Sequence, residues 1–133
     1  PPAQLELEIA ESVAMQQPDV VLALLNKLKS LGVRIVLDDF GIGLSGVAYL
    51  GRVPVDVIKI ARALVAAMPK EAERHPVVPA IVGLGHAFGL KVVAKGVETE
   101  AQKATLLAWG CDYLQGFLTG KPLDAASAAK DQP

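Results

Sequence analysis

The sequence has few of the features that would tie it to an oxidising compartment, a membrane or a nucleic acid. Cys111 is its single cysteine, which excludes an intrachain disulfide and a cysteine-based zinc site and suits a reducing compartment. No apolar run approaches the ~20 residues that span a bilayer, and no signal-peptide pattern is present. Thirteen Lys plus Arg stand against fourteen Asp plus Glu, which argues against a DNA or RNA surface but leaves room for a small nucleotide site. We therefore expect a cytoplasmic chain with no membrane segment of its own.

What the chain does contain is enough apolar sequence for one folded domain. It has 133 residues, of which 52% are hydrophobic and 20% are charged, as is typical of a single globular domain. It opens with Pro1-Pro2 and no initiator Met, so we expect it to be a piece of a longer parent protein. A membrane anchor elsewhere in that parent is compatible with this sequence.

Short apolar runs alternate with helical patterns along the chain. The runs predict strands near residues 5–9, 34–37, 55–60, 91–94 and 113–118. Helices are predicted over Pro18–Leu31, over 76–88 and from Thr99, where Gln102 completes the spacing of a capping box. This alternation favours the α/β class with a parallel sheet, either doubly wound or part of a βα barrel. We expect the tail, 124–133, to fray because it has little to bury.

Polar side chains gather at the predicted C-terminal ends of these strands. They are Glu8, Glu11, Asp38, Asp39, Lys59, Lys95, Glu98 and Gln115. The C-terminal ends of parallel strands lie on one face, where ligand sites form. Carboxylates gathered there suit Mg²⁺, Mn²⁺ or Ca²⁺, and two such ions can clamp a phosphodiester.

Taken singly, these residues have plainer explanations. An isolated Asp38-Asp39 pair is more often a turn, and Lys59 alone is more often a lysine that reaches solvent from a strand end. His75 and His86 have no metal-ligand spacing and are interpreted as structural. Only the joint placement of the acidic residues favours a functional site.

Four segments of the chain carry a resemblance to a known family. They are LELEIAES, DDFGIGLSGVAYLGRVPVDVIKI, VVAKGVETEAQ and GCDYLQGFLTGKPL. In order and spacing they resemble the successive blocks of the EAL domain, the βα-barrel family of cyclic di-GMP phosphodiesterases. The resemblance implies that residues 1–123 are the C-terminal half of such a domain. The fold it implies is a partial TIM-type barrel of about five parallel strands with covering helices, half of a barrel that takes ~250 residues.

The resemblance also implies roles for the residues at the strand ends. Glu8, Asp38 and Asp39 match the family's metal ligands, with Mg or Mn as the metal in active relatives. Lys59 matches the lysine that helps to orient the attacking water, and Gln115 matches the glutamine near that water.

Glu98 matches the second glutamate of the family's AEGVE block, and Glu11 matches the glutamate that braces the DDFG loop. The remaining matches are to the family's loop and nucleotide-binding residues, and they are Phe40, Gly41, Gly43, Gly116 and Pro122.

The chain departs from the family at positions that matter for catalysis. Lys95 stands where AEGVE has the glutamate that ligates the second metal and is thought to act as general base, and an ammonium has no lone pair to give a cation. Ala61 removes the acid of the family's KID block. The loop has Ile42, Leu44 and Gly46 where Thr, Tyr and Ser are usual. We expect Lys95 to lie beside the two aspartates and to take a cation's electrostatic place.

Three functions follow from these observations. The leading one is a degenerate, non-hydrolysing EAL module that acts in cyclic di-GMP signalling as a nucleotide receptor or interaction module. The second is an active Mg- or Mn-dependent phosphodiesterase producing pGpG. The third is a structural remnant that forms a homodimer through open barrel edges. An N-terminal GGDEF (diguanylate-cyclase-like) or sensory domain is expected in the parent protein.

Overall fold

The computed structural model describes residues 5–14, 16–41, 50–68, 77–116 and 123–124. The strands in these ranges are β1 (Glu6–Ala10), β2 (Arg34–Phe40), β3 (Val57–Ile60), β4 (Lys91–Lys95), β5 (Tyr113–Gln115) and β6 (Leu123–Asp124). The helices are α1 (Glu11–Ala14), α2 (Pro18–Ser30), α4 (Arg62–Ala66), α5 (Val77–Ala87) and α6 (Glu100–Ala108). Residues 117–118 of the predicted fifth strand and 125–133 of the predicted tail lie outside the described residues.

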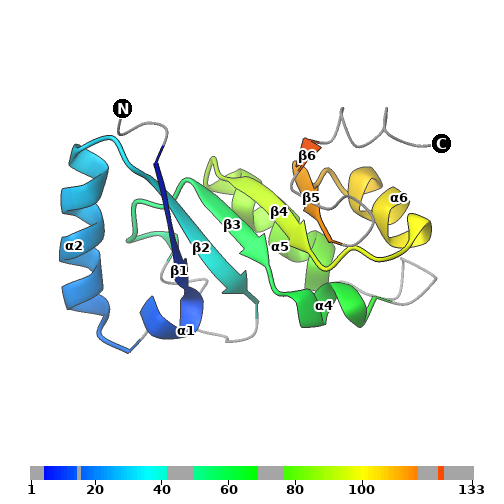
Figure 1. The fold of residues 1–133 in the computed structure, drawn as a ribbon, viewed down its shortest axis with the longest axis horizontal. Coiled ribbons are helices and arrows are strands. Elements are labelled where there is room, and N and C mark those ends of the chain that lie inside the picture. Colours follow the sequence, from blue (N-terminus) through cyan, green and yellow to red (C-terminus); the bar gives the residue numbers. More distant parts are fainter. Residues whose placement is uncertain (1–4, 15, 42–49, 69–76, 117–122, 125–133) are drawn as a thin grey trace.

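The strands form one sheet in the order β1-β2-β3-β4-β5-β6, with the first five parallel and β6 antiparallel to β5 (Figure 1). Each parallel strand pairs with the next one along the chain. A doubly wound sheet would reverse its strand order at a switch point, and the described strands do not. The predicted α/β class is confirmed, and the topology is that of part of a βα barrel.

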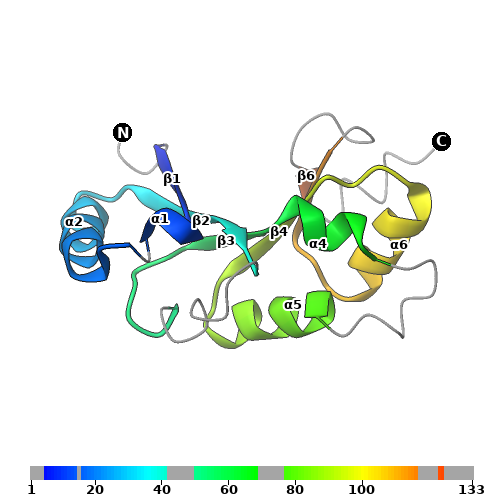
Figure 2. The same cartoon turned by 90° about the horizontal axis from the view of Figure 1, so that it is seen from below.

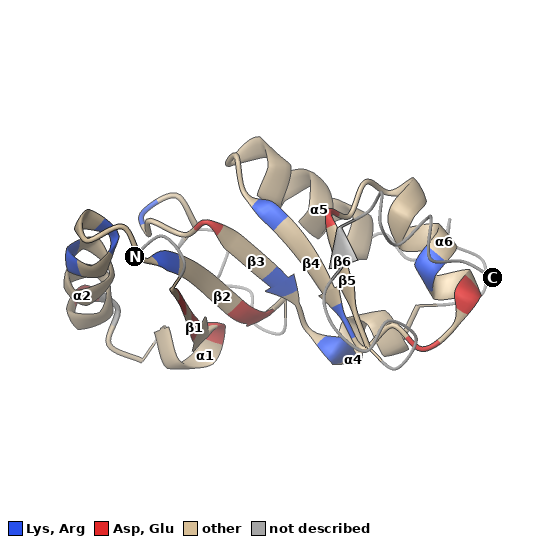
Figure 3. Cartoon of the chain, turned by 45° about the horizontal axis from the view of Figure 1, so that its top comes forward, with Lys and Arg blue, Asp and Glu red and all other residues tan. Residues whose placement is uncertain are grey.

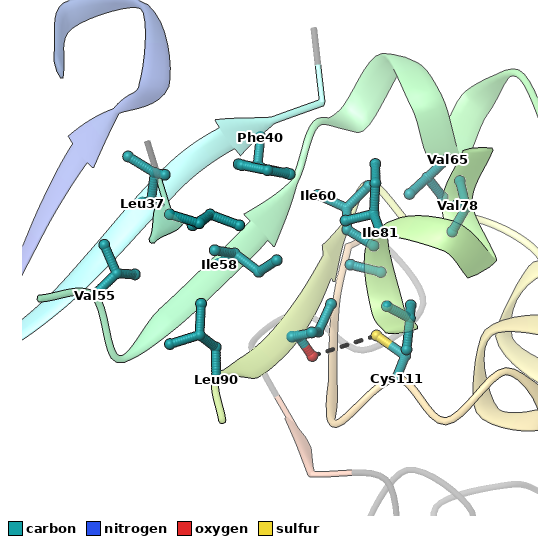
Figure 4. Packing of buried hydrophobic residues seen from close by; sticks show 14 of the residues in the cluster. Leu37, Phe40, Val55, Ile58, Ile60, Val65, Val78, Ile81, Leu90 and Cys111 are labelled. Atoms are coloured by element: carbon teal, nitrogen blue, oxygen red, sulfur yellow. Dashed lines mark hydrogen bonds between the residues drawn. The ribbon is translucent and has the colours of Figure 1, made fainter. Parts of the chain in front are cut away.

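Alternating strand residues build a core between the sheet and the helices. Figure 4 shows this packing, to which α4 and α5 contribute Val65, Val78 and Ile81. Strand residues on this face are Ile35, Leu37, Ile58, Ile60, Val92, Ala94 and Leu114, none of them more than 1% exposed. Figure 2 shows α5 beneath the sheet, and Gly85 allows its close approach, since a Cβ there would lie 2.6 Å from Val92 Cγ2. The period-two alternation therefore buries one face of the sheet against helices.

The opposite face of the sheet carries a second, smaller cluster. Val36, Val57 and Val93 are at most 4% exposed there and pack with Tyr113. They line a cavity of about 220 Å³ whose remaining walls include Arg34 and Lys59. In a closed barrel this face would be the interior. Side chains two residues further along a strand point to the same face. The polar residues Lys59, Lys95 and Gln115 therefore lie on the same face as Val57, Val93 and Tyr113.

Several element boundaries differ from the sequence predictions. The second strand runs on through the two aspartates to Phe40, whereas the apolar pattern ended at Leu37. The short helices α1 and α4 were not predicted, because four or five residues show too little periodicity. The capping box is confirmed: Gln102 N donates to Thr99 Oγ1 at 3.0 Å. Within the described residues, no helix has both the length and the apolar character needed to cross a bilayer.

Two adjacent leucines of α2 give a test of this packing. Leu25 is 0% exposed in the core, whereas Leu24 is 52% exposed. We predict that Leu25→Ala lowers the free energy of unfolding by ~2–5 kcal/mol through lost burial and a cavity. Leu24→Ala should change it by no more than ~0.5 kcal/mol. Urea unfolding measures both, and equal losses would contradict the assignment of the core.

Candidate functional site

The C-terminal ends of the parallel strands form a polar rim. Its strand residues are Glu8 on β1, Asp38 and Asp39 on β2, Lys59 on β3, Lys95 on β4 and Gln115 on β5. The sheet registers place Ala10 beside Asp38 and Lys95 beside Gln115. In Figure 3, acidic positions on β1 and β2 and basic positions at the ends of β3 and β4 face one another across this rim. The rim thus brings together the strand residues predicted to form a site.

A bulge in β2 directs the side chains of Asp38 and Asp39 toward the same point, where they meet Lys95. Consecutive residues of a regular strand point to opposite faces. Here the pairing of β2 with β3 shifts register between Leu37 and Phe40, and Asp39 has a φ of 55°. The Asp39 N–H donates to Asp38 Oδ1 at 2.9 Å, which fixes the turn. The irregular backbone therefore directs two adjacent carboxylates toward one point, as bulges near functional sites often do.

Lys95 reaches that point from β4, across the intervening strand β3. Its Nζ donates to Asp38 Oδ1 at 2.9 Å and to Asp39 Oδ1 at 3.2 Å. The side chains of Lys95 and Asp38 are 24% and 25% exposed, and that of Asp39 is 46% exposed. The expected position of Lys95 beside both aspartates is confirmed. One ammonium therefore bridges two carboxylates in a partly buried setting, where it is screened less than on an open surface.

The environment of Lys95 favours its charged form. Burial lowers the pKa of Lys95, but the hydrogen bonds and charges of Asp38 and Asp39 together outweigh it and raise the pKa above 10.5. The ammonium is therefore charged throughout the physiological range.

A second ion pair lies on the neighbouring strands. Lys59 Nζ is 2.5 Å from Glu8 Oε1, with the two side chains 13% and 46% exposed. The lysine and the glutamate thus neutralise one another between β1 and β3.

Glu11 and Phe40 lie at the C-terminal end of β2. The Glu11 carboxylate is buried, at 3% exposure, and accepts a hydrogen bond from the Gly41 N–H at 3.1 Å. Phe40 is 2% exposed in the hydrophobic core, so it anchors the end of β2. Gly43 and Pro122, the other expected loop and nucleotide positions here, lie outside the described residues.

The segment after β4 is held by contacts that the sequence did not reveal. Arg62 of α4 donates to Glu98 Oε1 at 3.2 Å, and its stem fills the space where a Cβ on Gly96 would stand. Gln102 Oε1 accepts from the Glu98 N–H at 2.8 Å, and Gln102 Nε2 donates to the Val65 carbonyl at 3.2 Å. Arg62 gave no signal in the sequence because the helix around it is short. Among the described residues, Glu98 thus forms its ion pair with Arg62 and not with a lysine of the rim.

Gln115 and Gly116 close the rim at β5. The Oε1 atom of Gln115 is enclosed and has no hydrogen-bond partner among the residues that the structure describes. Gly116 has a φ of 158°, and a Cβ there would lie 2.3 Å from the Val97 carbonyl oxygen, so only glycine fits. The unpaired amide oxygen of Gln115 is a candidate acceptor for a bound group, since a buried acceptor ordinarily has a donor.

The rim residues do not fit a divalent cation as they are placed. Such an ion needs several oxygen ligands that converge on one point without a neighbouring positive charge that repels it. The carboxylates of Asp38 and Asp39 already face the Lys95 ammonium, and Glu8 faces Lys59. Among the described residues, no group of three or more His, Cys, Asp or Glu side chains could hold a metal ion.

Comparison with known proteins identifies the family. The EAL domain family model matches residues 1–122. The chain belongs to the EAL domain family.

Among its curated relatives is the bifunctional diguanylate cyclase/cyclic di-GMP phosphodiesterase MucR of Pseudomonas aeruginosa, 45% identical over 93% of this chain and 18% of that protein. The cyclic di-GMP phosphodiesterase NbdA of the same organism is 40% identical over 92% of this chain and 16% of that protein.

Solved EAL structures share the fold. A MucR phosphodiesterase in complex with c-di-GMP superposes with a TM-score of 0.83 at 44% identity, covering 95% of this chain and 51% of that one. The EAL domain of Mycobacterium smegmatis DcpA gives 0.82 at 40% identity, covering 100% of this chain and 61% of that one. This EAL chain is therefore a partial barrel, which spans 51% and 61% of these two structures and under a fifth of MucR and NbdA.

The pKa of Lys95 gives a pH-dependent test. A lysine whose pKa is raised on folding stabilises the fold below its ordinary pKa of 10.5, and that contribution is lost as the pH rises through the folded value. We predict that the unfolding free energies of the wild type and Lys95→Met differ by a constant amount between about pH 7, where both aspartates are ionised, and about pH 10, and that they converge at higher pH. Chemical denaturation across this range measures the difference. A difference that grows above that pH would contradict the ion pairs.

Proposed function

We propose that this chain is part of a non-hydrolysing EAL module that acts in cyclic di-GMP signalling as a nucleotide receptor or interaction module. The observation that carries the proposal is the Lys95 ammonium, which lies against Asp38 and Asp39. The names of the relatives place the family in cyclic di-GMP turnover. Whether this chain can hydrolyse the nucleotide depends on the residues of its own rim, above all Asp38, Asp39 and Lys95.

The chemistry of the rim supports binding more than hydrolysis. Lys95 cannot coordinate a metal, and its charge repels a cation approaching the two aspartates. Losing one ligand and gaining a positive charge should cost several kcal/mol of transition-state stabilisation, on the order of 10³-fold or more in rate. The same ammonium is no obstacle to an anionic phosphate, which it would attract.

A second substitution acts in the same direction. Ala61 follows β3 directly and is 1% exposed. It stands at the N-cap of α4, where no side chain caps the helix. An aspartate at that position would supply both a cap and a carboxylate near the rim. Alanine supplies neither, so the rim has one carboxylate fewer than hydrolysis would need, and we interpret the catalytic roles of Lys59, Glu98 and Gln115 as vestigial.

The alternative is an active Mg- or Mn-dependent phosphodiesterase. Glu8, Asp38, Asp39 and Lys59 are all present, and the relatives above are named as phosphodiesterases. For this alternative to hold, Lys95 would have to leave the aspartates when metal binds. The two functions therefore differ in whether binding and hydrolysis of the nucleotide depend on a metal ion.

Nucleotide titration with and without metal tests the proposal. We predict that cyclic di-GMP binds the parent protein with a dissociation constant that Mg²⁺ and EDTA leave unchanged, and that no pGpG forms. Calorimetry and chromatography measure these two quantities. Turnover that a chelator abolishes would contradict the proposal. Absence of binding would remove the receptor role and leave the interaction module.

Two glutamate substitutions on β4 refine this test. Lys95→Glu should make binding metal-dependent, because it removes the ammonium and restores a carboxylate ligand. Lys91→Glu is the matched control, since Lys91 is exposed at the opposite end of the same strand. An equal effect of the two changes would show that net charge, and not the rim, controls the response.

A further inference from the structure

Two parts of the chain repeat each other in sequence at a nearly constant spacing. Residues 30–38, SLGVRIVLD, align with residues 87–95, AFGLKVVAK, at an offset of 57. Residues 55–59, VDVIK, align with residues 111–115, CDYLQ, at an offset of 56. In this alignment Asp56 corresponds to Asp112, and the rim residue Asp38 corresponds to Lys95.

The helix ends of the two parts are built in the same way. The Gly32 N–H donates to the Lys29 carbonyl at 2.9 Å, and the Gly89 N–H donates to the His86 carbonyl at 2.9 Å. The two glycines have φ values of 90° and 75°, the left-handed conformation that ends many helices. The helix residue three before each glycine, Lys29 or His86, is thus held at the same place relative to the next strand.

The two aspartates make equivalent contacts at the base of the sheet. Asp56 Oδ2 accepts from the Ile35 N–H at 2.8 Å, and its Oδ1 lies 2.5 Å from Lys29 Nζ. The Asp56 N–H donates back to the Ile35 carbonyl at 2.9 Å. The carboxylate therefore joins the strand before it to the helix that precedes that strand.

Asp112 repeats this pattern on the other unit. Its Oδ2 accepts from the Val92 N–H at 2.8 Å and lies 2.7 Å from His86 Nε2. The Asp112 N–H donates to the Val92 carbonyl at 3.0 Å. Each aspartate thus binds a strand residue and a side chain of the preceding helix. The strand residues, Ile35 and Val92, lie three positions before the rim residues Asp38 and Lys95.

We propose that Asp56 and Asp112 are equivalent positioning residues of a duplicated unit, each fixing the strand whose far end carries one member of the Asp38–Lys95 contact. This inference rests on the proposed role of that contact. β2 and β4 do not pair with each other, so their relative position depends on β3 and on the anchors at their bases. A small shift of either strand would separate atoms now 2.9 Å apart.

Alanine substitutions at the two anchors test the proposal in this chain without nucleotide or metal. Amide hydrogen exchange reports on the Ile35 and Val92 N–H groups. The ¹⁵N–¹H signal of the Lys95 ammonium reports on the rim, because it persists while its protons are held in hydrogen bonds. The matched control is Asp19→Ala, since the Asp19 side chain is 93% exposed and forms only a long ion pair, at 3.8 Å, with Arg52.

We expect Asp56→Ala to speed exchange of the Ile35 amide about tenfold or more, and Asp112→Ala to do the same for Val92. Each variant should also abolish the Lys95 ammonium signal, and Asp19→Ala should do neither. Asp56→Asn and Asp112→Asn keep an acceptor for the amide, so they should restore amide protection and the Lys95 signal.

The contrary results are distinct. A Lys95 signal that survives while an amide loses protection would reduce that aspartate to a structural role. A response at only one of the two anchors would overturn their equivalence. If the alanine variants do not fold, an asparagine variant that protects its amide but loses the Lys95 signal would also overturn the proposal. Because no nucleotide or metal is used, failure of the proposed function would leave these readouts unchanged.

Discussion

The contact of one ammonium with two adjacent carboxylates controls the chemistry of the rim. Asp38 and Asp39 would repel each other if nothing positive lay between them. Lys95 supplies that charge from within the chain, at 2.9 and 3.2 Å. A divalent ion could balance the same carboxylates, but it would also polarise a phosphate oxygen and activate water. The lysine balances the charge and provides neither of those effects.

The rest of the described fold serves this contact. The bulge in β2 turns both aspartates the same way, which a regular strand cannot do. Glu11 accepts a hydrogen bond from Gly41 directly after β2, and Gln102 and Arg62 hold the segment that follows Lys95. At the other end of the sheet, Asp56 and Asp112 fasten strands to helices. In βα barrels generally, functional residues lie at the C-terminal ends of the strands, and residues at the opposite ends stabilise the fold. The rim residues and the two anchors follow the same arrangement.

The sequence predicted the sheet and the neighbourhood of the rim residues, because apolar runs and strand-end polar residues are local patterns. It placed Asp38 and Asp39 after a strand, whereas they lie in a bulged continuation of it. A bulge depends on pairing with β3, and that pairing has no local sequence signal. The anchors Asp56 and Asp112 were also missed as a pair, although the offset between SLGVRIVLD and AFGLKVVAK was readable. The partners of Glu98 could not be predicted, since Arg62 reaches it from a five-residue helix.

The Lys95 ammonium contacts both Asp38 and Asp39 and so occupies the place that a metal would need. Crystals of this chain soaked in Mn²⁺ test it directly, because manganese gives an anomalous signal that nitrogen does not. We predict no anomalous peak within coordination distance of the two aspartates, and Lys95 Nζ in hydrogen-bond contact with both. A manganese peak there, with the lysine turned away, would contradict this role of Lys95.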